Sequence, residues 1–374
     1  MNNSYKIILA ICSILLVVGL MVIFGVIQIK NETKRQEEIE IGAILPLTGS
    51  AASLGEQIRD GMLFAVANVN FEGGINGRKL KLLYEDGQGD PKISINAFMK
   101  LVKVNQIKII VANLSNVALS LLPLVENNKV ILFADAAHPE ITGKSKYVFR
   151  HSHTASQEAK VIGEFSIDKL NSSNIVVSVM NDDYGVAFEK EIVNYFGYRD
   201  RKKILKNIFN FDKDEKDFTS LTTKILADRP DTIVIAGFEE GPGRIVRRLK
   251  ELGYRGNIIG TIAFSTPSAR NAAGDAAIGV YHPIYDMRLE DQNFENKSLE
   301  FFKYFNKKLT PFSILGYNTI SLISKALRET DSLDRDVLSD QIRKIGIYEG
   351  LFEHMNIQIS GDINPDLKMN KILK

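Results

Sequence analysis

The sequence predicts an α/β protein of two lobes, each a doubly wound parallel sheet with helices on both faces. Short apolar runs alternate with amphipathic helical patterns at intervals of about 30 residues, the length of a strand–helix–strand unit. The chain of 374 residues also exceeds one ordinary core, because domains centre on about 100–150 residues. Ligands of such sheets bind beyond the carboxyl ends of the strands, where we therefore expect a site.

The composition narrows the class of function. Hydrophobic residues make up 45% of the chain and charged residues 25%, as in folded proteins, and the formal net charge of +2 gives no basic excess for a nucleic-acid partner. Cys12 is the single cysteine. The chain can therefore form neither an intramolecular disulfide nor a cysteine-based metal site.

The chain begins with an apolar segment at residues 7–29, which reads IILAICSILLVVGLMVIFGVIQI. At about 1.5 Å per helical residue it can cross a hydrocarbon layer of about 30 Å, so it predicts a transmembrane helix. No small-residue cleavage site precedes Lys30, which favours a retained signal anchor over a cleaved signal peptide. Cationic residues are enriched on the cytoplasmic side of a membrane helix. Lys6 precedes the segment, whereas Lys30, Lys34 and Arg35 follow it, so this count alone would place the large domain in the cytoplasm.

Strands and helices are expected in alternation beyond this segment. Apolar runs predict strands at Glu40–Leu45, Lys79–Glu85, Lys108–Ala112, Val130–Ala134, Asn174–Val179, Lys203–Phe209, Thr232–Ala236 and Asn257–Thr261. Helical spacing of apolar residues predicts helices at Leu54–Val69, Pro91–Asn105, Ser156–Leu170, Gly185–Phe196, Gly243–Leu252 and Gly316–Arg328. This alternation is what makes the predicted sheets parallel.

The first strand leads into a loop of small residues, Thr48–Ala52, and then into a helix. Ser53 and Glu56 match a capping box, so we expect the helix to begin there with its free amides toward the mouth of the sheet. The small residues would let these amides approach a negatively charged group. The same stretch also fits an ordinary strand–helix turn. The helix that follows has an apolar stripe, which consists of Ile58, Met62, Ala65, Val66 and Val69.

Two motifs resemble catalytic or nucleotide sites but fit simpler explanations. Asp86 and Asp90 could be paired carboxylates, yet Asp90 before Pro91 fits a helix N-cap followed by proline at the first helical position. Gly241-Pro-Gly243 is a fragment of a dinucleotide loop without its third glycine or a following acidic residue. We expect a structural role for the first motif and no nucleotide site at the second.

The histidines and tyrosines complete the candidates. His151 and His153 could hold a metal from one face of a strand, but no third ligand lies near them, and no G-x-S-x-G motif occurs. We therefore expect no metal, no cofactor and no enzyme activity. Tyr184 opens a helix after a buried strand and Tyr317 lies on a helix; both rings suit either a ligand cleft or ordinary packing.

Four stretches of the chain carry a family pattern. They are IEIGAILPLTG at the first strand, EGGING at Glu72–Gly77, NDDYGVAF around Tyr184, and EKDFT at Glu215–Thr219. Together they resemble the branched-chain amino-acid (Leu/Ile/Val) binding proteins of ABC transporters. The resemblance extends from Ile39 to the C-terminus.

The resemblance implies the periplasmic binding protein type I fold, in which two lobes joined by three crossovers close on a ligand. Carried over to this chain, residues 1–38 are the anchor helix and linker. Lobe 1 then comprises residues 39–150 plus 283–348, and lobe 2 comprises residues 151–282 plus 349–374.

The resemblance also implies a set of ligand-binding residues. It places the carboxylate of an amino acid against Ser115 and against the loop at Ala136, Ala137 and His138. The aromatic positions of the family's cleft fall on Tyr184, Phe238, Tyr317 and Leu54, where Phe238 replaces a tyrosine and Leu54 stands at a position that is commonly aromatic.

The chain departs from the family at the residue that pairs with the ligand's ammonium group. The family has an acidic residue after the strand at Asn257–Thr261, and this chain has Ile262. A buried ammonium needs a compensating charge or full hydrogen bonding. Asp135, Asp183 or Glu239 could supply that charge from neighbouring loops; otherwise the ligand is not a standard α-amino acid.

The predicted function is that of a membrane-tethered solute-binding protein with its binding domain on the extracytoplasmic side. It would pass a small amino-acid-like molecule to the permease and ATPase subunits of an ABC importer. The count of cations around the apolar segment predicts the opposite orientation. We give the location implied by the resemblance more weight than this count. The alternative is a ligand-sensing or regulatory lobe that acts through a separate membrane partner.

Overall fold

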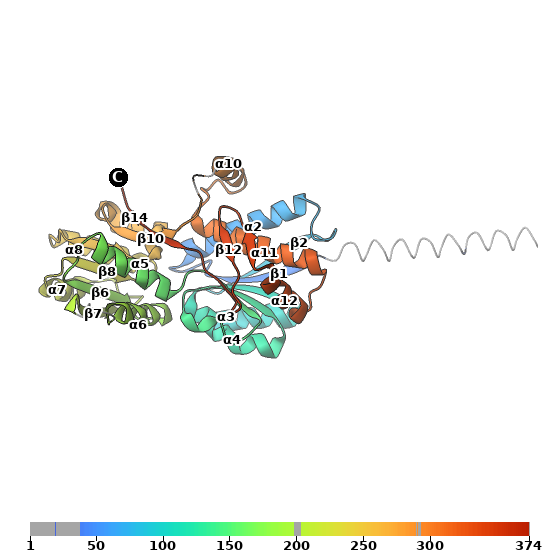
Figure 1. The fold of residues 1–374 in the computed structure, drawn as a ribbon, viewed down its shortest axis with the longest axis horizontal. Helices are drawn as coiled ribbons and strands as arrows, with labels where there is room; N and C mark the ends of the chain where they lie inside the picture. Colours follow the sequence, from blue (N-terminus) through green and yellow to red (C-terminus); the bar gives the residue numbers. More distant parts are fainter. Residues whose placement is uncertain (1–18, 20–37, 198–202, 289, 291–292, 374) are drawn as a thin grey trace, which may run out of the picture.

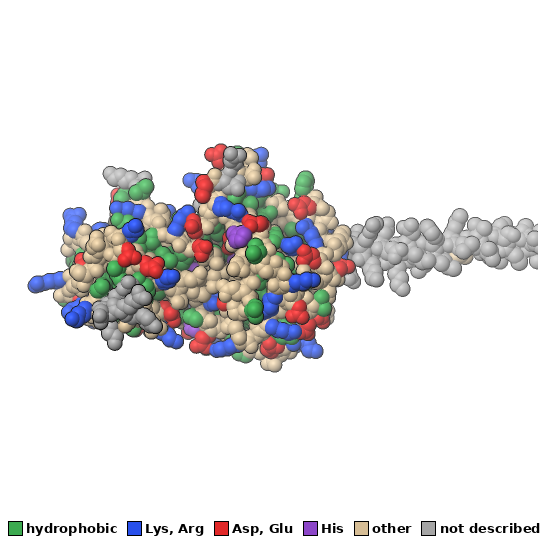
Figure 2. Space-filling model, in the orientation of Figure 1, with side chains coloured by type: hydrophobic (Ala, Val, Ile, Leu, Met, Phe, Trp, Pro, Cys, Tyr) green, Lys and Arg blue, Asp and Glu red, His purple; other side chains and the backbone are tan. Residues whose placement is uncertain are grey.

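The computed structural model of the chain describes residue 19 and residues 38–197, 203–288, 290 and 293–373. The described chain folds into two six-stranded sheets, which form two lobes lying end to end in Figure 1. Acidic and basic side chains are interspersed over the face shown in Figure 2, in keeping with the small net charge. The α/β class with two parallel-sheet lobes is therefore confirmed.

The two sheets differ only at one edge. The first has the order β13 (Asp362–Ile363), β5 (Val148–His151), β4 (Ile131–Asp135), β3 (Ile109–Asn113), β1 (Ile39–Leu45), β2 (Leu80–Asp86), all parallel. The second has the order β14 (Leu367–Lys371), β10 (Tyr281–Tyr285), β9 (Asn257–Gly260), β8 (Thr232–Ala236), β6 (Ile175–Met180), β7 (Leu205–Phe211), with β14 antiparallel. A separate hairpin pairs β11 (Ile347–Glu349) with β12 (His354–Asn356).

Helices cover both faces of each sheet (Figure 1). In the first lobe they are α2 (Ala52–Phe71), α3 (Pro91–Met99), α4 (Ser115–Asn128), α10 (Asn293–Phe305), α11 (Pro311–Thr330) and α12 (Arg335–Ile345). In the second they are α5 (Ala155–Asp168), α6 (Asp183–Gly197), α7 (Thr219–Ala227), α8 (Glu240–Glu251) and α9 (Pro267–Ala273). Strands such as β3 and β8 are buried along their whole length for this reason.

All eight predicted strands are present, as β1 to β4 and β6 to β9. The strands that the sequence did not predict are β5, β10, β13 and β14, which lie where the chain passes between the sheets, and the hairpin strands β11 and β12. They are short or carry several polar residues, as in VFRH at β5 and LKMNK at β14. A short polar strand has no periodic apolar signal to detect.

The predicted transmembrane segment at residues 7–29 lies, except for Gly19, outside the described residues. None of the helices within the described ranges is long and apolar enough to cross a membrane.

The chain passes between the two sheets three times. The passages follow β5, β10 and β13. We expected the second passage at Pro283 and the third at Glu349, but β10 continues to Tyr285 in the second sheet, and β13 still belongs to the first. Residues between these points, including Met355 and Ile357, are buried in the core of the first lobe. The third passage is therefore later than predicted.

A buried ion pair fastens the first and third passages together. Arg150 of β5, 3% exposed, donates from Nε to Asp362 Oδ1 of β13 at 2.8 Å and from Nη1 to the His138 carbonyl at 2.7 Å. Partial burial raises the pKa of Asp362, but bonds from Thr142 and the charge of Arg150 outweigh it and hold that pKa below its usual value. The neighbouring His151 contacts Thr319 Oγ1 at 2.8 Å and Glu353 Oε1 at 3.0 Å.

The predicted capping box at the start of the first helix is absent. The helix begins at Ala52, so Ser53 lies inside its first turn, and its N-cap Ala51 offers no side-chain bond. Asp86 instead fixes the preceding loop, because it accepts from the amide of Leu47 at 2.9 Å and the hydroxyl of Thr48 at 2.5 Å. The predicted Asp90 cap is confirmed, with bonds from the amides of Lys92 and Ile93.

Helices α2 and α11 cross without room for side chains at the crossing. A Cβ added to Gly61 would lie 1.8 Å from the carbonyl oxygen of Ser313, and one added to Gly316 would lie 2.3 Å from that of Ile58. Both obstacles are backbone atoms, which a rotamer change does not move. The two glycines therefore set the distance between these helices and, through them, the packing of the first lobe.

We expect Gly61→Ala to lower the free energy of unfolding by at least about 2 kcal/mol, because the crossing must widen to admit the methyl group. Denaturation in urea measures this loss. The matched control is Gly197→Ala at the end of α6, where an added Cβ meets nothing within 4 Å. A control of unchanged or slightly higher stability is expected. Equal stabilities for the two variants would contradict the close crossing.

Candidate functional site

Loops from both sheets meet where the strands end, at a boundary that we call the seam. The first lobe contributes Ser50 after β1, Ser115 after β3, and residues 136–138 after β4. The second contributes Tyr184 after β6, Phe238 and Glu239 after β8, and Ile262 after β9. These are carboxyl ends of parallel strands, which is where sheets of this kind bind ligands.

The first-lobe side of the seam presents a helix start and a loop of small residues. Ser115 is the first residue of α4, and its Oγ accepts from the amide of His138 at 3.2 Å. Ala136 and Ala137 are both buried, and the Ala137 carbonyl accepts from the amide of Ala155 in the second lobe. Free amides at a helix start favour a negatively charged group, and small side chains allow close approach to the backbone.

The second-lobe side of the seam is aromatic. The rings of Tyr184 and Phe238 have centroids 4.7 Å apart. Tyr184 is buried and Phe238 is half-buried. Phe238 packs against three hydrophobic clusters, and one of them contains Ala137 of the first lobe together with Tyr184 of the second. Apolar side chains of both lobes therefore come together beside these rings.

A polar contact between the loops after β1 and β8 borders a cavity. The hydroxyl of Ser50 lowers the pKa of the Glu239 carboxyl, but burial outweighs this effect and raises that pKa above its ordinary value. The cavity next to this contact has a volume of about 650 Å³. Its walls come from Gly49, Ser50 and Ser53 of the first lobe and from residues 213–216 and 239–241 of the second, among others. The small-residue loop after the first strand thus faces an interlobe cavity.

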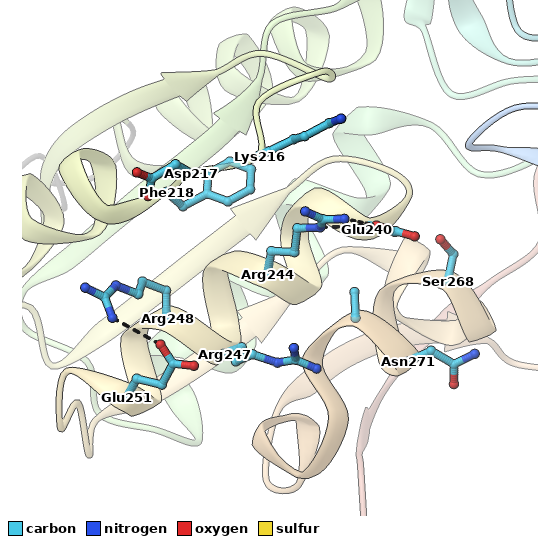
Figure 3. A pocket seen from close by; sticks show the side chains of 11 residues that line it. Lys216, Asp217, Phe218, Glu240, Arg244, Arg247, Arg248, Glu251, Ser268 and Asn271 are labelled. Atoms are coloured by element: carbon cyan, nitrogen blue, oxygen red, sulfur yellow. Dashed lines mark hydrogen bonds and ion pairs between the residues drawn. The ribbon is translucent and has the colours of Figure 1, made fainter.

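A second cavity of about 620 Å³ adjoins the first and is lined by the second lobe alone (Figure 3). Helix α8 supplies most of its charges. In Figure 3, Arg244 turns toward Glu240 and Arg248 toward Glu251, each an ion pair along the same helix. These four charges are already paired along one helix, and the groove is lined by one lobe, so it is a weaker candidate for a ligand site than the seam.

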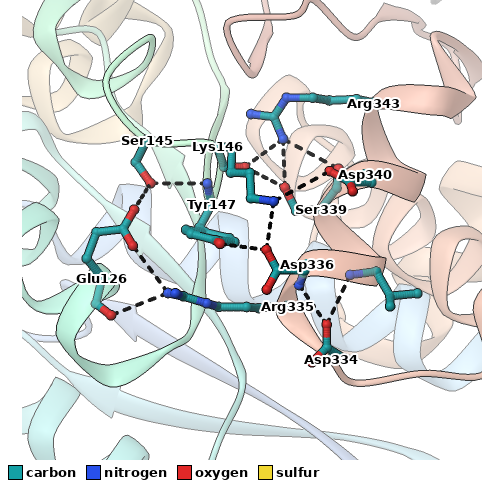
Figure 4. A network of polar contacts seen from close by, with 11 residues as sticks. Glu126, Ser145, Lys146, Tyr147, Asp334, Arg335, Asp336, Ser339, Asp340 and Arg343 are labelled. Carbon is teal, nitrogen blue, oxygen red and sulfur yellow. Dashed lines mark hydrogen bonds and ion pairs between the residues drawn. The ribbon is translucent and has the colours of Figure 1, made fainter.

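A polar network on the first lobe lies away from the seam (Figure 4). The hydroxyl of Tyr147 donates to Asp336 at 2.6 Å, and Arg335 lies over the ring of Tyr147 with 3.8 Å between its Cζ and the ring centroid. Arg343 donates to the carbonyl of Lys146 at 2.6 Å. These contacts fasten α12 to the segment before β5 and have a structural role.

The predicted binding residues fall into two groups. Ser115, Ala136, Ala137, His138, Tyr184 and Phe238 lie at the seam. Tyr317 and Leu54 do not. The ring of Tyr317 packs 5.6 Å from that of Phe64, and its hydroxyl accepts from Asn68 at 3.2 Å, so it belongs to the packing of α2 with α11. Leu54 is 6% exposed and is part of the first lobe's core.

The sequence analysis missed Glu158, which is 0% exposed at the seam. Its Oε1 accepts from the amide of Ile262 at 2.7 Å, and its Oε2 accepts from the hydroxyl of Tyr184 at 2.5 Å. A signal was present in the sequence. Glu158 lies on the buried stripe of α5 with Ala155, Ala159 and Ile162, where an apolar residue is expected.

The three acidic residues proposed from the sequence have other surroundings. Asp183 is exposed, and Glu239 interacts with Ser50. Asp135 accepts from Asn113 Nδ2 at 2.9 Å. Burial raises the pKa of Asp135 to about 6, against the opposing effects of bonds from Ser152 and Asn113 and of nearby histidines.

The two neighbouring histidines serve separate contacts. His151 lies between Thr319 and Glu353, whereas His153 Nδ1 lies 3.1 Å from the hydroxyl of Tyr285 and its Nε2 lies 3.4 Å from Glu158 Oε2. Within the part of the chain that the structure describes, no group of three or more His, Cys, Asp or Glu residues is arranged to hold a metal ion.

Comparison with known proteins gives a family for this architecture. The family model described as periplasmic binding protein matches residues 38–366. The chain is 29% identical to the Leu/Ile/Val-binding protein BraC3 of Rhizobium johnstonii over 247 residues, which cover 65% of this chain and 66% of that protein. It is 24% identical to the leucine-, isoleucine-, valine-, threonine- and alanine-binding protein of Pseudomonas aeruginosa, over 82% of each chain.

A solved structure shares the fold over nearly the whole described chain. The crystal structure of the leucine-binding protein LivK from Thermotoga maritima superimposes with a TM-score of 0.83 at 21% identity, covering 90% of this chain and 96% of that one.

The raised pKa of Asp135 gives a prediction for stability. Because the folded state takes up the proton more readily, the carboxyl's contribution to stability is complete below pH 3.8 and is lost as the pH rises through about 6. Asp135→Asn lacks this titration. Its free energy of unfolding relative to the parent should therefore increase between pH 4 and 7, by about 1–3 kcal/mol.

Urea unfolding at a series of pH values measures the difference between Asp135→Asn and the parent. The control is Glu164→Gln, an exposed residue of α5, whose difference from the parent should stay flat. A constant difference for Asp135→Asn over the same range would show that this carboxyl does not titrate as described.

Proposed function

The chain belongs to the periplasmic binding protein family, and we propose that it is the substrate-binding component of an ABC importer that holds an amino acid or a related compound at the seam. The family match over residues 38–366 supports the class of function. The observation that carries the site is that Ala137 of the first lobe and Tyr184 of the second belong to one hydrophobic cluster, at the carboxyl ends of parallel strands of both sheets.

The proposed mechanism is closure of the lobes on the ligand. The amides at the start of α4, the hydroxyl of Ser115 and the loop Ala136–His138 would receive the carboxylate, while Tyr184 and Phe238 would cover the rest of the molecule. A ligand that touches both lobes stabilises the closed form in proportion to its additional contacts there. The hinge passages would bend without separating, because β5 and β13 remain paired within one sheet.

Transport is favoured over the sensory alternative. The two relatives and the solved structure described above are named as amino-acid-binding proteins. The family consists of solute-binding proteins, and binding and release are the chemistry that the seam residues offer.

We also propose that residues 7–29 anchor the protein in the membrane with both lobes on the extracytoplasmic side. The support is the length and apolarity of this segment and the absence of a cleavage site before Lys30. Residues 30–38 would then be the linker between the anchor and the two lobes.

We expect the purified full-length chain to bind at least one member of a panel of L-amino acids in isothermal titration calorimetry. Ser115→Ala should weaken that binding by about 1–3 kcal/mol, because a buried carboxylate loses a donor. Ser120→Ala is the matched control, since Ser120 lies on the same helix and donates to the carbonyl of Val117. Unchanged affinity in Ser115→Ala would mean that the carboxylate site lies elsewhere.

We expect the full chain to remain with the membrane fraction after washing with alkaline carbonate, and a chain that lacks residues 1–37 to appear in the soluble fraction. Immunoblotting of both fractions measures this partition. A full chain released by the wash, or found shortened at its N-terminus, would rule out a retained anchor.

A further inference from the structure

We propose that Glu158 is the acidic residue that pairs with the ligand's ammonium group, in place of the acid that is missing at Ile262. The inference rests on the proposed function and adds a specificity-determining residue to it. It also selects the class of ligand: a molecule with a cationic amine next to its carboxylate, as in an α-amino acid.

The first argument is position. Ile262 follows β9 at the seam, and its backbone amide donates to Glu158 Oε1 at 2.7 Å. A carboxylate from another element therefore lies against the backbone of the residue from which an acid was expected. Glu158 reaches this point from the first turn of α5, 104 positions earlier in the chain.

The second argument is the balance of charge. Glu158 is completely buried, and its two hydrogen bonds come from neutral donors, the hydroxyl of Tyr184 and the amide of Ile262. Neutral donors compensate a buried carboxylate only in part. His153 Nε2 lies 3.4 Å from Oε2, and this nitrogen is buried without a hydrogen-bond partner. The arrangement thus has a buried carboxylate whose hydrogen bonds come from neutral donors, beside a buried histidine nitrogen without a hydrogen-bond partner.

The third argument is access. Glu158 is bonded to Tyr184, whose ring is tilted by 51° against that of Phe238. Tyr184 belongs to a hydrophobic cluster that also contains Ala137 of the first lobe, so its ring borders the seam. The side chain of Tyr184 is therefore what separates the carboxylate of Glu158 from the seam.

The other acidic residues at the seam fit the role less well. Asp183 is exposed, so water already solvates its charge. Glu239 interacts across the seam with Ser50, and Asp135 accepts from Asn113. Glu158 alone among these four combines complete burial with contacts to both Tyr184 and Ile262.

The test compares two ligands that differ only in the ammonium group, L-leucine and 4-methylpentanoate, on the purified full-length chain by calorimetry. Glu158→Gln should weaken L-leucine binding about 30-fold or more, because a buried charge pair loses one partner. Binding of 4-methylpentanoate should change by less than threefold. Glu158→Asp, which keeps the charge on a shorter arm, should retain more of the L-leucine affinity than Glu158→Gln. Glu164→Gln, on the same helix, should match the parent for both ligands.

Each result decides the proposal. A folded Glu158→Gln that binds L-leucine as tightly as the parent, or that loses both ligands equally, overturns it while leaving the proposed function intact. If the variants do not fold, the parent alone decides, because it must prefer L-leucine to 4-methylpentanoate by about 100-fold or more. Equal binding by the parent overturns the proposal. If the parent binds another L-amino acid instead, that amino acid and its desamino analogue replace the pair. Failure of the parent to bind any amino acid refutes both the proposal and the function on which it rests.

Discussion

The architecture depends on buried charge at the hinge. Arg150 and Asp362 lie on adjacent strands that belong to different passages of the chain, and each would be a costly buried charge without the other. The next residue, His151, contacts Glu353, which precedes the third passage, and Asn318 also donates to this carboxylate. Two consecutive residues of β5 therefore bind the segment that contains Glu353 and Asp362. The hinge then behaves as one unit about which the lobes can pivot.

This hinge determines where the lobes touch. With β5 and β13 paired, the loops after β1 and β8 are opposed. Ser50 interacts with Glu239, and Ala137 of the first lobe packs in one cluster with Tyr184 of the second. The residues that keep the lobes in contact are thus neighbours of the residues that would touch a ligand. Opening costs these contacts and ligand binding adds to them, so the affinity measured for any ligand includes the population of the closed form.

Sequence reasoning succeeded where one local cause decides the structure. Continuous apolar runs predicted the eight strands β1 to β4 and β6 to β9, and the Asp90 and Pro91 pair predicted a helix start. It failed where a distant group decides. The capping box at Ser53 is absent because Asp86, from the next strand, fixes the preceding loop and the helix begins earlier. Tyr317 was expected in the cleft, but its neighbours are Phe64 and Asn68 on a helix that the sequence does not place beside it.

The acid at the seam is the clearest case of this limit. A binding site requires a charge at a given position in space, whichever element supplies it. Glu158 accepts from the backbone amide of Ile262, so its carboxylate can place a negative charge close to where an acid at position 262 would place one. The chain's departure at Ile262 is therefore compatible with a cationic ligand. It also gives the amine of the ligand a specific role. A buried carboxylate whose hydrogen bonds come from neutral donors is only partly compensated, and a bound ammonium would supply the missing charge. In the proposed site, a ligand without an amine would leave Glu158 without this partner, so the ligand's charge decides its affinity.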